Sequence, residues 1–125
     1  MAFVALRVEI DDREAVRWAH AGLAHTLERI GFDADRVGHL IAVAWEIWTN
    51  AQQFAAGSIA TVSIDEHSRS ITLTTTGPAF DSVARAGQPG ARGLETAKWR
   101  VTAAGCTWSY ACTNERNEIR IDYGG

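Results

Sequence analysis

The stretch AVAWEIWTNAQQFA, residues 42–55, has the spacing of a long amphipathic helix. We expect this helix to begin at residues 33–35 and to end before Gly57, because glycine commonly follows the last helical residue. Glu46 and Asn50 are four residues apart, so they lie side by side on one helical face, roughly opposite the apolar stripe. The stripe that we expect to be buried consists of Val37, Leu40, Ile41, Ala44, Ile47, Trp48, Ala51 and Ala55.

The segments before this helix predict a strand and a first helix. Asp11 and Asp12 are suited to cap a helix that runs to about Ile30 and stops at Gly31. The apolar arc of that helix comprises Val16, Ala19, His20, Leu23, Leu27 and Ile30. The preceding residues alternate as a strand does, with one face formed by Val4, Leu6, Val8 and Ile10.

The segments after the long helix predict mainly paired strands. Four stretches alternate between apolar and polar side chains, namely residues 59–65, 70–76, 106–113 and 118–123. EHSR and NERN are the expected turns, and a short helix is expected at residues 94–103. An irregular stretch at residues 77–93 holds both prolines and four glycines, and loops of this length are usually functional or disordered.

Each predicted strand is apolar on one face and polar on the other, which favours helices on one face of the sheet only. The order is strand, helix, helix, strand, strand, helix, strand, strand. This order predicts a single α+β domain over residues 1–125, a two-layer sandwich in which three helices cover one face of a five-stranded mixed sheet.

The composition excludes several classes of protein. The 125 residues include 12 basic and 15 acidic side chains, a formal charge of -3, whereas nucleic-acid binders usually carry a basic surplus. No apolar run approaches the ~20 residues of a membrane span, and the start MAFVALRVEI lacks the features of a signal peptide. We therefore expect a cytoplasmic protein with no nucleic-acid or membrane partner. Cys106 and Cys112 lie ~20 Å apart along an extended strand, too far for a disulfide.

Three short motifs in a fixed order carry a resemblance to a known family. Glu46-x-x-x-Asn50-Ala51 lies in a helix, TTTGPAFD (residues 74–81) follows a strand, and GARGLE (residues 90–95) opens a helix. Together they resemble the N, G1 and G2 boxes of GHKL-type ATP-binding domains, which have the histidine kinase-like ATPase (Bergerat) fold. The chain is most similar to the anti-sigma-factor serine/threonine kinase branch, and the resemblance covers essentially all of it.

The resemblance implies roles for several residues. Glu46 matches the general base and Asn50 the Mg²⁺ ligand of an ATP site, and carboxylate and amide oxygens suit that chemistry. Without the resemblance, Glu46 and Asn50 are interpreted as ordinary polar residues on a solvent-exposed face of the helix. ATP and Mg²⁺ are the cofactors that the resemblance implies, with a lid loop at about residues 77–93.

The G1 box departs from the family pattern Asp-x-Gly-x-Gly. Gly77 fits, but Thr75 stands where the adenine-binding Asp is expected and Ala79 where the second glycine is expected. A threonine hydroxyl accepts a hydrogen bond without charge and with less reach. Losing a charged, buried hydrogen bond typically costs about 1.5–3 kcal/mol, or one to two decades of ATP affinity.

The G2 box also departs from its pattern, Gly-x-Gly followed by an apolar residue. Gly90, Arg92 and Gly93 remain near the position where backbone N–H groups would face phosphates. Arg92 suits contact with an anion, and Gly93 suits close approach of the backbone. The alternative is that both glycines are turn and cap residues. The last box, Gly-Thr entering the final strand, is replaced by ERNEIRI.

Two tryptophans are candidates for a protein contact, and the histidines are not metal candidates. Trp18 points away from the buried arc of its helix, beside His25 and Arg29, which is the composition of an interface anchor. Trp45 flanks the stripe of the long helix and extends this patch, whereas Trp48 and Trp108 are expected in the core. The histidines lack Cys or carboxylate partners at metal-binding spacing, and the core-facing one is expected to be a buried structural residue.

Three functions follow from these observations. The first is an anti-sigma-factor-like regulatory protein with a degenerate ATP site, whose partner is a protein such as a sigma factor or an anti-anti-sigma factor. The second is an active ATP- and Mg²⁺-dependent serine/threonine kinase or ATPase. The third is a binder of another small ligand in the same pocket. The resemblance is compatible with a homodimer.

Overall fold

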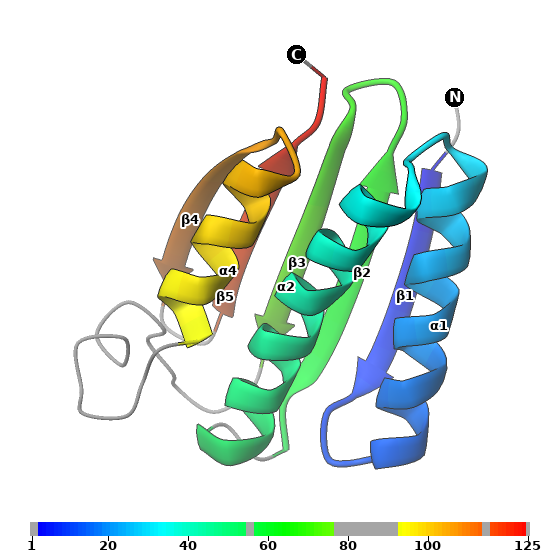
Figure 1. The fold of residues 1–125 in the computed structure, drawn as a ribbon. Coiled ribbons are helices and arrows are strands. Elements are labelled where there is room, and N and C mark those ends of the chain that lie inside the picture. Colours follow the sequence, from blue (N-terminus) through cyan, green and yellow to red (C-terminus); the bar gives the residue numbers. More distant parts are fainter. Residues whose placement is uncertain (1–2, 55–56, 77–92, 114–115, 125) are drawn as a thin grey trace.

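The computed structural model describes residues 3–54, 57–76, 93–113 and 116–124, which form a two-layer α+β fold (Figure 1). The elements in chain order are β1 (Phe3–Glu9), α1 (Arg13–Arg29), α2 (Ala34–Phe54), β2 (Ile59–Asp65), β3 (Ser70–Thr76), α4 (Gly93–Ala103), β4 (Thr107–Thr113) and β5 (Arg116–Asp122). The three helices lie side by side on one face of the five-stranded sheet, with α2 between α1 and α4. The predicted sandwich of three helices on five strands is therefore confirmed.

The prediction of a mixed sheet is wrong, because every pairing in the sheet is antiparallel. The strand order is β1-β2-β3-β5-β4. Two helices separate β1 from β2, and each helix reverses the chain, so β2 returns antiparallel to β1 (Figure 1). A single helix joins β3 to β4, which would make these strands parallel if they paired. The strand β5 lies between them and pairs antiparallel with both.

Local sequence explains where the helices begin and end. The Asp12 side chain accepts hydrogen bonds from the N–H groups of Glu14 (3.1 Å) and Ala15 (3.0 Å), which confirms the predicted cap of α1. Gly31, which follows α1, and Gly105, which follows α4, have φ angles of 107° and 75°. Glycine adopts this conformation without the strain that a side chain would add.

The apolar faces predicted from the sequence form the core. Trp48, on α2, is 1% exposed, and the inward residues of the central strands are buried as expected, including Val62, Ile71 and Ile121. Val43 is also fully buried, although the predicted stripe omits it. The reason is that α2 is packed on both sides, against α1 and α4, so its buried arc is wider than that of a surface helix.

Two smaller differences concern the final hairpin and Trp108. NERN is not wholly a turn, because Arg116 and Asn117 already belong to β5 and pair with Thr113 and Cys112 of β4. Trp108 is half-buried against the core rather than fully inside it.

Among the described helices, none combines the length and the apolar character that crossing a bilayer requires.

Candidate functional site

The fold brings the parts of three elements that carry the predicted motifs to one end of the molecule. The second half of α2, the C-terminal end of β3 and the N-terminal end of α4 all lie at the lower end of the view in Figure 1. They carry Glu46 on α2, Thr75 on β3 and Gly93 at the start of α4. These three residues come from stretches of chain up to 47 positions apart, so the proximity of their elements is a property of the fold.

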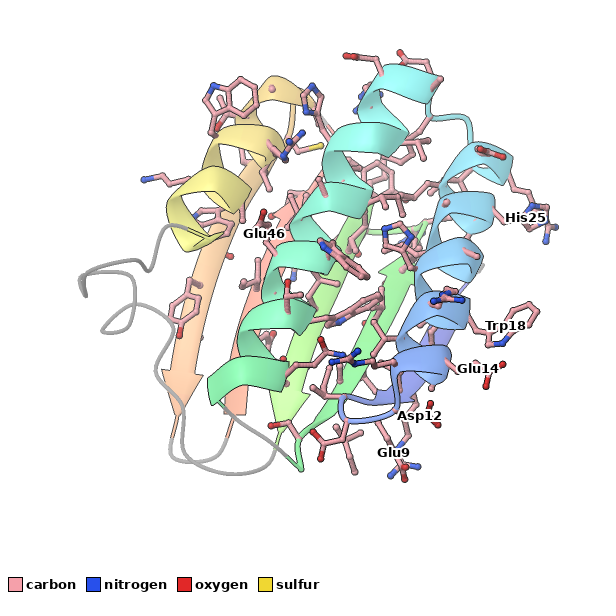
Figure 2. The ribbon with its side chains drawn as sticks, turned by 60° about the horizontal axis from the view of Figure 1, so that its bottom comes forward. Glu9, Asp12, Glu14, Trp18, His25 and Glu46 are labelled. Carbon is pink, nitrogen blue, oxygen red and sulfur yellow. The ribbon has the colours of Figure 1, made fainter. Side chains whose placement is uncertain are left out.

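Glu46 projects from the side of α2 that faces α4, away from α1 (Figure 2). It is half-buried, so it does not lie on a fully solvated helical face. Its carboxylate has no hydrogen-bond or ion-pair partner among the described residues. A half-buried carboxylate without a partner is available to accept a proton or to bind a ligand, which is the chemistry required of a general base.

Thr75 lies next to last in β3 and is 5% exposed. It shares the helix-covered face of the sheet with Ile71 and Leu73, so its side chain lies between the two layers. The residue that replaces the expected Asp is therefore a buried, neutral side chain. A hydroxyl here supplies a hydrogen bond but no charge to any ligand held between the sheet and the helices.

The remaining predicted site residues are only partly described. Asn50 lies in α2, one turn after Glu46, but its side chain is outside the described part of the structure. Gly77, Ala79, Gly90 and Arg92 also lie outside the described residues. Their proposed roles in binding ATP or Mg²⁺ remain predictions from the sequence.

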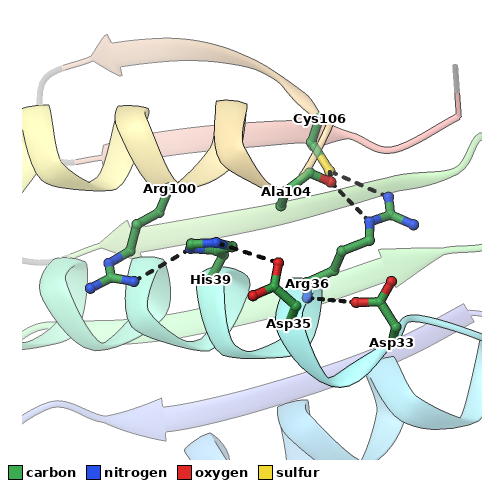
Figure 3. A network of polar contacts seen from close by, with 7 residues as sticks. All are labelled: Asp33, Asp35, Arg36, His39, Arg100, Ala104 and Cys106. Carbon is green, nitrogen blue, oxygen red and sulfur yellow. Dashed lines mark hydrogen bonds and ion pairs between the residues drawn. The ribbon is translucent and has the colours of Figure 1, made fainter.

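Arg36 attaches the end of α4 to the start of α2 (Figure 3). Its Nε donates a 2.9 Å hydrogen bond to the carbonyl oxygen of Ala104, just after the end of α4. Its guanidinium carbon also lies 4.4 Å from the centre of the Phe32 ring, a cation–π distance. The last carbonyls of a helix lack partners within the helix, so this arginine both caps α4 and fixes it beside α2.

A second polar contact between α2 and α4 involves His39 and Arg100 (Figure 3). Nδ1 of His39 lies 3.4 Å from an amino nitrogen of Arg100, and Nε2 lies 3.8 Å from a carboxylate oxygen of Asp35. Arginine only donates hydrogen bonds, so Nδ1 must accept and the ring proton belongs on Nε2, toward the carboxylate. The Nε atom of Arg100 is buried without a hydrogen-bond partner in the described structure.

Three tryptophans lie at the surface of the helical layer. Trp18 is 72% exposed, Trp99 62% and Trp45 48%. Trp18 projects outward from α1, on the opposite side of the helical layer from Glu46 (Figure 2). The predicted exposure of Trp18 is confirmed, whereas Trp99 on α4 was not singled out by the sequence, since one exposed residue on a short helix leaves no periodic signal.

No metal cluster is found among the described residues, where no three His, Cys, Asp or Glu side chains come together. Cys106 is a buried free thiol, and its Sγ lies 3.6 Å from the carbonyl oxygen of Ala104.

In comparisons with known proteins, the chain matches no family model, and no curated protein is significantly similar to it in sequence.

Proposed function

We propose that this chain is a regulatory protein that works by binding another protein, and that it is related to the anti-sigma-factor branch of GHKL-type domains. Its cytoplasmic partner would be a sigma factor or an anti-anti-sigma factor. The order of the three motif-like segments supports this proposal, as does the layer of three helices on one face of a five-stranded sheet. In this proposal the nucleotide pocket is degenerate and the ATP site is weak or absent.

The observation that carries the proposal is the exposure of Trp18. A tryptophan that is 72% exposed leaves a large apolar surface in water, and tryptophan is among the residues most enriched at the centres of protein interfaces. Trp18 lies on the outer side of α1, away from Glu46, so a partner can cover it without entering the predicted nucleotide site.

The burial of Thr75 supports the degenerate pocket. A carboxylate at this place would bind the adenine amino group of ATP through a charged hydrogen bond, and a buried threonine offers only a neutral one. The expected deficit of about 1.5–3 kcal/mol weakens ATP binding by one to two decades.

Glu46 favours a second function, an active serine/threonine kinase or ATPase. Its half-buried carboxylate, unpartnered among the described residues, faces the side of α2 where α4 lies. In an active enzyme this carboxylate would take the proton of the attacking hydroxyl, while Asn50 would hold Mg²⁺ beside it.

The first experiment tests the protein contact. Tagged wild-type chain is compared with Trp18→Ser and with the matched control Trp99→Ser, which removes an equally large exposed ring from α4. We expect a specific partner, identified by mass spectrometry and reconstituted with purified protein, to lose affinity at least about tenfold with Trp18→Ser only. Equal loss with both variants would indicate nonspecific adhesion and would contradict the proposal.

The second experiment measures ATP binding by calorimetry, with and without Mg²⁺. No binding heat up to millimolar ATP, from folded protein, supports the degenerate pocket. Micromolar, Mg²⁺-dependent binding that Asn50→Ala abolishes would instead establish the enzyme, and phosphate transfer lost in Glu46→Gln would then assign the base.

A further inference from the structure

A cleft of about 360 Å³ lies between α1 and α2. Four residues of α1 and two of α2 line it, namely Arg13, Val16, Arg17, His20, Trp45 and Gln52. None of the residues predicted for the ATP site is among them, and Glu46 projects from the other side of α2. The volume falls within the range of sites for small molecules.

The charged side chains that line the cleft, those of Arg13 and Arg17, are both basic. Arg13 and Arg17 are exposed and lie one helical turn apart on α1, which places both side chains on the same face. Neither forms an ion pair with a carboxylate among the described residues, and the nearby Asp12 carboxylate already caps the helix. A guanidinium group matches the geometry of a carboxylate or phosphate group, and two of them line this cleft.

The wall of the cleft is aromatic and apolar. Trp45 is 48% exposed, and His20 forms a T-shaped contact with its ring, with 5.6 Å between the ring centres. Val16, at 3% exposed, adds an aliphatic surface. A tryptophan with half of its surface uncovered inside a concave site is suited to pack against a second flat ring.

Gln52, on α2, adds a polar group across the cleft from the helix that carries the arginines. The side-chain N–H of Gln52 donates a 3.0 Å hydrogen bond to the carbonyl oxygen of Ile10, which fixes the amide and leaves its carbonyl oxygen as an acceptor. Burial lowers the pKa of His20 below its ordinary value of 6.5, so at neutral pH the ring is uncharged and the positive charge is confined to the two arginines.

We propose that this cleft binds a small organic anion, a flat aromatic ring that carries one carboxylate or phosphate group. Arg13 and Arg17 hold the anionic group, and Trp45 packs against the ring. The site is separate from the predicted ATP site, and the proposal does not depend on the function proposed above. A ligand bound in this cleft would contact α1, the helix whose outer face carries Trp18.

Benzoate and phenyl phosphate are the probes, titrated into the whole chain and followed by NMR of the tryptophan indole N–H groups. Trp45→Phe identifies the signal of Trp45. We expect at least one probe to shift that signal with a Kd at or below about 1 mM. Inorganic phosphate, which has no ring, and benzyl alcohol, which has no charge, should each bind at least about tenfold more weakly.

Matched variants separate this site from a general attraction of anions. Arg13→Gln combined with Arg17→Gln should weaken binding at least about tenfold, whereas Arg29→Gln, an exposed arginine at the far end of α1, should leave the Kd unchanged. All of these arginines are exposed, so circular dichroism should confirm that the variants remain folded.

Three results would overturn the proposal: no shift of the Trp45 signal with either aromatic anion, equal binding of inorganic phosphate, or an equal loss in Arg29→Gln. Because ATP also combines a ring with phosphates, the calorimetric titration of ATP should be repeated on both sets of variants. Binding lost in Asn50→Ala belongs to the predicted ATP site, and binding lost in the double arginine variant belongs to this cleft.

Discussion

Arg36 connects three segments of the chain through one side chain. It lies in the first turn of α2, bonds to the carbonyl oxygen of Ala104 after α4, and covers the ring of Phe32 before α2. Substitution by alanine removes the arginine donor from the Ala104 carbonyl, leaving only the weak thiol donor of Cys106, and removes the cation–π contact. We therefore expect Arg36→Ala to lower the free energy of unfolding by about 1.5–3 kcal/mol, as measured by urea denaturation.

The control for this prediction is Arg120 on β5, an exposed arginine whose Nε lies 3.0 Å from the carboxylate of Asp122. Exposed ion pairs contribute little, so Arg120→Ala should cost at most about 1 kcal/mol. Similar losses in the two variants would show that the contact of Arg36 with Ala104 contributes no more to the free energy of unfolding than an exposed ion pair does.

His20 makes the stability of the protein depend on pH. Burial lowers its pKa in the folded chain from the ordinary 6.5, so the unfolded chain binds the proton more tightly. The free energy of unfolding should therefore be highest above pH 6.5 and should decrease as the pH falls through 6.5 toward the lower pKa of the folded state. Denaturation of wild type and His20→Gln across this range checks the prediction, because the variant should lack this part of the decrease. His25→Gln, at an exposed position on the same helix, is the control, and an equal change there would contradict the assignment.

At the scale of single elements, the sequence predicted most of what the structure shows. The Asp12 cap, the ends of the helices at glycines and the inward faces of the strands depend on residues within one or two turns of each other. The contact between Arg36 and Ala104 spans 68 positions, and no local pattern indicates it. The burial of Val43 has the same origin, because it depends on which helix lies beside α2.

The candidate site was predictable only in part, for a related reason. The motif-like segments could be placed on a helix, a strand end and a helix start, and the structure has those elements at one end of the molecule. The cleft between α1 and α2 left no such signal. Arg17 and Trp45 come together there only because two helices pack at a particular angle and depth.

The cap of α1 provides a prediction at the scale of one helix. Asp12→Ala removes the acceptor of two N–H groups and should lower the free energy of unfolding by about 1 kcal/mol in urea denaturation. Asp12→Asn retains an oxygen of the same reach, so it should be much closer to wild type. If Asn costs as much as Ala at this position, the capping hydrogen bonds are not the cause.

At the scale of the whole molecule, the same substitution at two tryptophans of the helical layer should change stability by very different amounts. Trp48 is 1% exposed at the centre of the core, and Trp48→Ala should cost about 3–5 kcal/mol through the cavity that it leaves. Trp18 is 72% exposed, and Trp18→Ala should change stability by no more than about 0.5 kcal/mol. Thermal unfolding of both variants checks this contrast. A large loss of stability with Trp18→Ala would mean that Trp18 stabilises the fold, and it would contradict its assignment to binding a partner protein.

The position of β5 between β3 and β4 has a consequence for synthesis on the ribosome. Residues 70–76 of β3 obtain their second neighbour only when residues 116–122 have emerged. Until then β3 presents unpaired backbone groups to other nascent chains, and β4, which pairs with β5, has nothing to hold it in the sheet. Translation that stalls before Arg116 should therefore yield chains that depend on chaperones, because β5 is the strand that joins β4 to the rest of the sheet.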